Sequence, residues 1–239
     1  MSEVIVITSG KGGVGKTTTC VNLASYLALM GKKVLAVDID PQGNCSSGFG
    51  VDKTKVKYST YSVLSGETDA KNAIIPTLVK NLDIMPSNSD LAGAEVELVG
   101  VEDREKVLKK VLSPLRNSYD YILIDCPPSL ALLTVNALTA ANSILIPIQG
   151  EYYALEGLNQ VLKTVDLVKR KLNPQLELEG VVFTMYDART NLSLQVVENV
   201  KQNLNERIYK TIIPRNVRLA EAPSHGMPIN LYDSRSTGA

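Results

Sequence analysis

The sequence is poor in the residues that build covalent or metal-bound frameworks. Its 239 residues include three cysteines, Cys20, Cys45 and Cys126, and a single histidine, His225. An odd number of cysteines without a close pair argues against a disulfide framework, a zinc site or an iron–sulfur cluster held within one chain. We therefore expect buried, reduced thiols, with Cys126 packed as a small apolar side chain and His225 in a structural role.

Long apolar runs are also missing. One of the longest, residues 144–148, falls far short of the roughly 18 residues that a membrane-spanning helix needs. Residues 1–3 lack the basic start of a signal peptide. These absences predict a cytoplasmic protein that needs no membrane.

Net charge is absent as well, because 25 Lys and Arg balance 25 Asp and Glu. This balance excludes a protein that is basic over its whole surface, which is the simplest kind of nucleic-acid binder. The charges are not evenly spread: residues 1–159 hold 14 basic and 17 acidic residues, and residues 160–239 hold 11 and 8. A local basic patch in the last third of the chain remains compatible with these counts.

What the sequence does contain is a regular alternation of short apolar runs and longer helical patterns. Strand-like runs lie at residues 4–7, 34–37, 82–85, 121–124, 144–146, 181–183 and 208–213, and helical periodicity is clearest at 17–30, 103–117, 153–171 and 192–205. This alternation predicts an α/β fold with a doubly wound, mostly parallel sheet and helices on both faces. No linker divides the chain, so we expect one domain over residues 1–239. Ser236 or Thr237 could cap a further helix, so we also expect that the natural chain continues beyond Ala239.

A phosphate-binding loop follows the first apolar run. Residues 10–17 read GKGGVGKT and match G-x-x-x-x-G-K-[ST] between a strand and an amphipathic helix. Glycines let backbone N–H groups converge on the α- and β-phosphates, and the helix N-terminus favours negative charge. The motif predicts that Lys16 reaches the β- and γ-phosphates and that the Thr17 hydroxyl ligates Mg²⁺.

Further charged residues stand where this loop would need them. Asp125 closes the apolar run 121–124 and is expected to hold Mg²⁺ through water. Asp38 and Asp40 follow the second run and would place carboxylates beside the γ-phosphate. Lys11 is a second lysine in the loop, and because Lys16 already serves the phosphates of its own nucleotide, Lys11 is a candidate for a role across a dimer interface.

Six motifs together resemble the deviant Walker A ATPases of the ParA/MinD class, and within it the chromosomal ParA-type partition proteins often called Soj. The resemblance extends from residue 5 to residue 238 and rests on residues 11–18, 38–44, 125–129, 151–157, 187–191 and 213–218. The first three motifs recur across the wider class, whereas the last three are specific to ParA-type members.

The resemblance implies a P-loop NTPase fold and roles for individual residues. Lys11 would contact the nucleotide of the partner subunit, Gly12 would lie at the dimer contact, and Asp40 would position the attacking water. Lys11, Lys16 and Asp40 are thus the expected catalytic residues. The ATP-binding set that the resemblance implies is Gly12, Gly13, Val14, Gly15, Lys16, Thr17, Thr18, Met185, Pro214 and Asn216, of which the last three would line the adenine pocket.

The resemblance also implies partners and a cycle. An ATP-bound homodimer would bind double-stranded DNA without sequence preference through Arg189 and Arg218, and hydrolysis, stimulated by a ParB-type centromere-binding protein, would release it from the nucleoid. Lys201, Arg207 and Arg215 are either further members of this patch or solvated charges.

Two other functions remain open on the sequence. A membrane-positioning ATPase of the MinD type would need a C-terminal amphipathic helix, which is not found by Ala239. A nitrogenase-reductase-like protein would need cysteines on a dimer face, a requirement that Cys20, Cys45 and Cys126 do not evidently meet.

Overall fold

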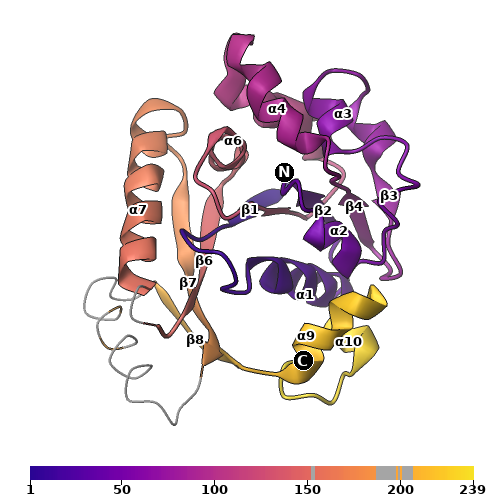
Figure 1. Cartoon of the computed structure of the whole chain (residues 1–239), viewed down its shortest axis with the longest axis vertical. Helices are drawn as coiled ribbons and strands as arrows, with labels where there is room; N and C mark the ends of the chain where they lie inside the picture. Colours follow the sequence, from indigo (N-terminus) through magenta and orange to yellow (C-terminus); the bar gives the residue numbers. More distant parts are fainter. Residues whose placement is uncertain (152–153, 187–197, 199, 201–206) are drawn as a thin grey trace.

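The centre of the molecule is one twisted sheet with helices on both sides (Figure 1). The computed structural model describes residues 1–151, 154–186, 198, 200 and 207–239. Over this part of the chain the strand order is β3-β4-β2-β5-β1-β6-β7-β8, and every neighbouring pair is parallel except β3 with β4. The strands are β1 Glu3–Ile7, β2 Val34–Asp38, β3 Ile75–Pro76, β4 Leu82–Met85, β5 Tyr121–Asp125, β6 Ser143–Gln149, β7 Glu177–Tyr186 and β8 Ile208–Pro214.

The central strands are apolar on both faces because both faces are covered. In β1, Val4 and Val6 join the core on one side of the sheet, while Ile5 and Ile7 join the core on the other side. Continuous burial of this kind is typical of parallel sheets, whose crossover connections place helices on both faces.

Helices from separate parts of the chain cover the two faces. The α-helices are α1 Lys16–Leu29, α2 Asn44–Gly48, α3 Thr60–Leu64, α4 Leu91–Glu97, α5 Val107–Leu112, α6 Leu132–Ala140, α7 Ala154–Lys171, α9 Val217–Glu221 and α10 Ile229–Tyr232. Side chains of α1 and α2 belong to one core, and side chains of α3, α4, α5, α6 and α7 belong to the other. The predicted doubly wound α/β fold is confirmed.

The C-terminal helices extend the layer that contains α1. Ser25 in α1 donates a hydrogen bond to the Asn230 side chain of α10 at 2.7 Å, and the Ile229 amide donates to the Asn22 side chain at 2.7 Å. Residues some 200 positions apart in the sequence are therefore joined beside the helix that follows the phosphate loop.

One helical prediction needs correction, and a second cannot be compared with the described residues. The helix expected over 103–117 is broken into a 3₁₀ turn (Arg104–Lys106), α5 and a second 3₁₀ turn (Ser113–Leu115). Pro114 stands at this second turn and has no N–H to donate, which opposes a continuous helix. The helix expected over 192–205 falls almost wholly outside the described residues.

No helix within the described residues is long and apolar enough to cross a bilayer.

Candidate nucleotide-binding site

The phosphate loop lies at the carboxyl ends of the central strands. Residues 8–15 connect β1 to α1, and β1 lies between β5 and β6. Gly13 and Gly15 have φ values of 74° and 86°, in the left-handed region where glycine carries little strain. The N-terminus of α1 has no side-chain cap and no acidic residue in its first turn. Its first N–H groups and its dipole are therefore suited to an anion.

Lys16, the first residue of α1, is held inside this loop. Its exposed fraction is 7%, and its ammonium group donates to the Lys11 carbonyl at 2.9 Å. Burial lowers the pKa of Lys16, and the charges of Asp125 and Asp40 partly oppose this shift. A buried ammonium group aimed along the loop is a strong partner for phosphate oxygens.

Thr17 and Asp125 meet, as expected of a magnesium site. The Thr17 hydroxyl donates to Asp125 Oδ2 at 2.8 Å, from α1 to the end of β5. Asp125 is fully buried, and its second oxygen, Oδ1, has no hydrogen-bond partner within the described chain. Burial, followed by the charge of Asp38, raises the pKa of Asp125 well above its ordinary value. An unsatisfied buried acceptor costs about 1–3 kcal/mol, so this oxygen favours a ligand.

These residues fit a magnesium ion in particular. Within the described residues, no group of three or more His, Cys, Asp and Glu side chains could hold a metal on its own. Mg²⁺ commonly keeps several waters and uses one or two protein oxygens together with substrate phosphates. One hydroxyl and one carboxylate beside a phosphate loop match that requirement.

The two other carboxylates differ in their surroundings. Asp38 is fully buried, accepts hydrogen bonds from the Ser46 amide and hydroxyl at 2.8 and 2.7 Å, and accepts from the Asp40 amide at 3.1 Å. Burial raises the pKa of Asp38 to about 6. Asp38 therefore anchors the start of α2. Its place beside the γ-phosphate stays a prediction.

Asp40 heads the turn that leads into α2. Its Oδ1 accepts from the Gln42 amide at 2.9 Å, and its carbonyl accepts from the Gly43 amide at 2.8 Å. Lys53 donates to the Gln42 carbonyl at 2.7 Å. The Asp40 side chain is thus held by the turn itself, next to the end of β2.

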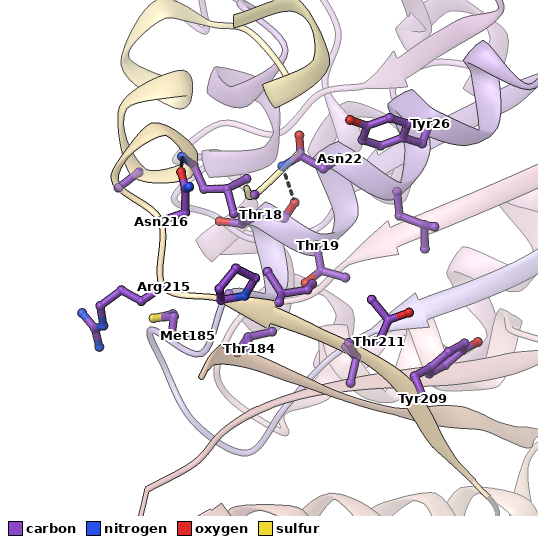
Figure 2. A pocket seen from close by; sticks show the side chains of 18 of the residues that line it. Thr18, Thr19, Asn22, Tyr26, Thr184, Met185, Tyr209, Thr211, Arg215 and Asn216 are labelled. Atoms are coloured by element: carbon purple, nitrogen blue, oxygen red, sulfur yellow. Dashed lines mark hydrogen bonds between the residues drawn. The ribbon is translucent and has the colours of Figure 1, made fainter. Parts of the chain in front are cut away.

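A pocket of about 480 Å³ opens beside the loop (Figure 2). Met185, Pro214 and Asn216 line it together with Gly15 and Thr18, so the three residues expected to line an adenine pocket come together there. Its lining is largely apolar, as small-molecule sites commonly are.

The local structure of two of these residues bears on the shape of the pocket. Met185 has a φ of 49°, a left-handed conformation that is costly for a side chain of this kind and that clusters at ligand sites. Asn216 caps α9 by accepting from the Leu219 amide at 3.1 Å, and it donates to the Thr237 hydroxyl at 2.8 Å. The rim of the pocket is fixed by these contacts.

Sequence reasoning missed several residues of this pocket. Thr184, at the end of β7, donates to the Val14 carbonyl at 2.7 Å and so ties β7 to the phosphate loop. Asn22 lies one turn along α1 and donates to the Thr18 carbonyl at 2.8 Å. The rule that ligands lie outside the carboxyl ends of parallel strands could have identified Thr184, whereas no local signal marks Asn22.

The candidate DNA-binding residues are only partly described. Arg189 and Lys201 lie outside the described residues. Arg218 on α9 is half exposed, and its guanidinium contacts Glu221 at 2.9 Å and Asp233 at 3.5 Å. Arg207 contacts Glu177 at 3.4 Å, and Arg215 lines the pocket.

The cysteines do not form a surface site. Cys20, Cys45 and Cys126 are free thiols and fully buried. Burial raises the pKa of Cys126 well above its ordinary value, which opposes nucleophilic or cluster-binding chemistry there. His225 stacks on Tyr232 with ring centroids 4.8 Å apart.

Comparison with known proteins agrees with this geometry. A family described as an AAA domain matches residues 2–178. The sporulation initiation inhibitor protein Soj of Bacillus subtilis is 58% identical over all of this chain and 94% of its own length. The chromosome-partitioning ATPase Soj of Treponema pallidum is 51% identical over all of this chain and 93% of its own length.

A solved structure provides the corresponding likeness in three dimensions. Cobyrinic acid a,c-diamide synthase from Mycobacterium smegmatis, with bound ATP analog and magnesium, has a TM-score of 0.86 and 35% identity, and the match covers 98% of each chain.

Proposed function

The chain belongs to the ParA/Soj family of chromosome-partitioning ATPases, and from this premise we propose that it is a magnesium-dependent ATPase whose nucleotide state controls dimerisation and DNA binding. The observation that carries the proposal is the contact between Thr17 and Asp125, with one buried carboxylate oxygen left over, directly beside the phosphate loop. The matching solved structure with an ATP analog and magnesium supports the same ligands.

The chain's own residues bind and orient the nucleotide. Backbone N–H groups of residues 10–15 and the start of α1 cradle the phosphates, and Lys16 neutralises charge on the β- and γ-phosphates. Thr17 and Asp125 would hold Mg²⁺, which would supply positive charge to offset the negative charge that develops during phosphoryl transfer. Met185, Pro214 and Asn216 hold the base in the apolar pocket.

Asp40 orients the water that attacks the γ-phosphate. Its backbone is fixed by the turn at 40–43, and its carboxylate stands at the end of β2, next to the strand that carries Asp125. Phosphoryl transfer depends mainly on such positioning and on electrostatic stabilisation.

Dimerisation is supported by a glycine that the described part of its own chain does not require. The φ of Gly12 is not in the left-handed region. A Cβ added to Gly12 would have Pro128 Cβ as its nearest described neighbour, at 3.9 Å, which is an ordinary contact. We assign the need for glycine to a second subunit facing the loop, with Lys11 reaching the nucleotide of that subunit.

Binding of DNA would follow from bringing two basic patches together. Arg189 and Arg218 contact phosphates in each subunit, and a dimer doubles the number of contacts without any new chemistry. Hydrolysis, stimulated by a ParB-type partner, separates the subunits and releases the protein from the nucleoid.

The test of the switch uses Asp40→Ala. Light scattering after size exclusion, in ADP and in ATP with Mg²⁺, should show that the variant stays dimeric in ATP while hydrolysis falls about 100-fold or more. Asp52→Ala, on an exposed loop, is the matched control and should behave as the wild type. An Asp40→Ala protein that remains monomeric in ATP would overturn the scheme.

The test of the partner uses Arg189→Glu. Co-sedimentation with DNA in ATP should be lost in this variant while its affinity for ATP stays the same. Anionic liposomes serve as the comparison: retention on liposomes, with no retention on DNA, would contradict the proposal in favour of a membrane-positioning ATPase.

A further inference from the structure

The first turns of α7 press against the phosphate loop. Gly157, in the interior of α7, is buried, and a Cβ added there would lie 3.3 Å from Lys11 Cγ and 3.7 Å from Lys11 Cδ. A Cβ added at Gly10 would lie only 2.5 Å from the Gly157 carbonyl oxygen. The loop and the helix therefore touch backbone to backbone, and the stem of Lys11 lies over the bare Cα of Gly157.

Nothing in α7 itself calls for a glycine at this position. Gly157 does not have a positive φ, and it is neither at the start nor at the end of the 18-residue helix. Glycine is, after proline, the poorest helix former. The requirement comes from the phosphate loop that lies against it.

We propose that Gly157 is a positioning residue for Lys11. The gap left by the missing side chain forms a seat for the aliphatic stem of Lys11, and this seat sets the direction in which the ammonium group points. The inference rests on the proposed function, because its consequence for catalysis requires that Lys11 serves the nucleotide of a second subunit. It adds that α7 controls whether Lys11 can do so.

Gly157→Ala is the variant that tests the seat. The distance of 3.3 Å is tight, but the contact is with a flexible stem, so Lys11 moves and the fold persists. Lys16 and Thr17 are untouched, so the affinity for ATP should stay within about twofold. Misplacing a reacting group by about 1 Å can cost about 100-fold, and we expect kcat and ATP-dependent dimerisation to fall by at least about 10-fold.

Gly93→Ala is the matched control. Gly93 lies in the interior of α4, and among the described residues a Cβ added there would meet only Glu97 Oε1, at 3.6 Å. Replacing a helical glycine by alanine without a clash should raise the Tm by about 2–4 °C and leave kcat unchanged. The proposal would be overturned if Gly157→Ala had the same kcat as Gly93→Ala. It would also be overturned if Gly157→Ala lost ATP affinity and kcat to the same extent.

A second measurement tests the contact without nucleotide. In a Lys11→Ala background the aliphatic stem of Lys11 is gone, so adding Gly157→Ala should raise the Tm by the full amount, about 2–4 °C. In the wild-type background the stem is present, and the same substitution should raise the Tm less or not at all. The double variant must fold even if Gly157→Ala alone does not. Equal Tm changes in the two backgrounds would overturn the proposal.

This design separates two kinds of failure. A wild-type protein that never dimerises in ATP contradicts the proposed function. The Tm comparison would still show whether Gly157 and the stem of Lys11 are in contact. A wild-type protein that does dimerise, with no coupling between positions 11 and 157, contradicts the seat alone.

Discussion

At the scale of single residues, two fully buried aspartates lie opposite each other on neighbouring strands and have different hydrogen-bond partners. Asp38 and Asp125 are paired in register on β2 and β5. Asp38 accepts hydrogen bonds from two Ser46 groups and from the Asp40 amide. Among the described residues, by contrast, the Asp125 carboxylate accepts only from Thr17, and its other oxygen has no partner. The hydrogen bonds of the fold satisfy the first carboxylate, and the second keeps an oxygen for the proposed ligand.

The buried carboxyl of Asp38 predicts an unusual pH dependence of stability. Its pKa is about 6 in the folded protein and about 3.9 in an unfolded chain, so between these values the folded state holds a proton that the unfolded state has lost. The free energy of unfolding of the nucleotide-free, metal-free protein should therefore fall as the pH rises from about 4 to about 6, and Asp38 should contribute up to about 3 kcal/mol of this fall. Urea unfolding across this range measures it.

The controls for this pH prediction are two conservative variants. Asp38→Asn should make the fall clearly shallower, because one titrating group is gone, whereas Asp125, whose pKa is also raised, still contributes. Asp52→Asn should not, because hydrogen bonds to Thr54 and Lys55 lower the pKa of the exposed Asp52 to about 2, below the window. An unchanged slope in Asp38→Asn would refute the assignment.

The residues of the site differ in how far the sequence could predict them. Lys16, Thr17 and Asp125 follow from a motif and from a strand that ends in a carboxylate, so their meeting could be expected from the sequence alone. The anchoring of Asp38 could not, because it depends on Ser46, whose hydroxyl also accepts from the Ser87 amide of a distant loop. Contacts of this kind are set by how loops pack, which has no periodic signature.

At the scale of elements, α2 is joined to the segment after α9 by a contact between two glycines. Gly50 and Gly226 both have left-handed φ values, and a Cβ added at Gly226 would lie 2.6 Å from Gly50 Cα. The loop that follows Asp40 and α2 is thus packed directly against the C-terminal part of the chain that carries Asn216 and Arg218.

Gly226→Ala should therefore destabilise the protein through two separate causes. The left-handed conformation costs about 1–2 kcal/mol for a residue with a Cβ, and the overlap with Gly50 adds about 1–3 kcal/mol. Gly66→Ala is the control, since Gly66 has a φ of 80° but open space around its missing side chain. Denaturant unfolding should show a larger loss for Gly226→Ala, and equal losses would mean that the close contact carries no strain.

Elements were predictable where burial leaves a recognisable pattern in the sequence. The apolar run 121–124 became β5 and the stripe in 153–171 became α7, because burial of a whole run or of one stripe leaves a period in the sequence. Helix α6 was not predicted, since Leu132–Ala140 is buried on nearly all sides and has no polar face to mark its period. The short α2, α9 and α10 are likewise set by tertiary contacts.

For the whole molecule, zero net charge conceals an uneven distribution. The segment 160–239 contains 11 basic and 8 acidic residues, and some of the basic side chains already form ion pairs within the chain. Arg218 contacts Glu221 and Asp233, and Tyr232 donates to Glu221 at 3.1 Å. Exposed ion pairs contribute little to stability, so in the proposed complex a DNA phosphate would replace these carboxylates at little cost.

The salt dependence of DNA binding tests this distribution in the proposed dimer. Each phosphate contact contributes about 0.9 to the slope of log affinity against log salt, and a dimer presents Arg218 twice. Arg218→Gln should therefore reduce the magnitude of this slope by about 2. The measurement is fluorescence anisotropy of a short DNA duplex, with the substitution made in the ATP-bound Asp40→Ala protein. Arg170→Gln makes the same change of charge on the last turn of α7, far from α9 (Figure 1). Its slope should match that of the parent, because charge acts through local phosphate contacts; equal reductions in both variants would instead mean that only overall charge matters.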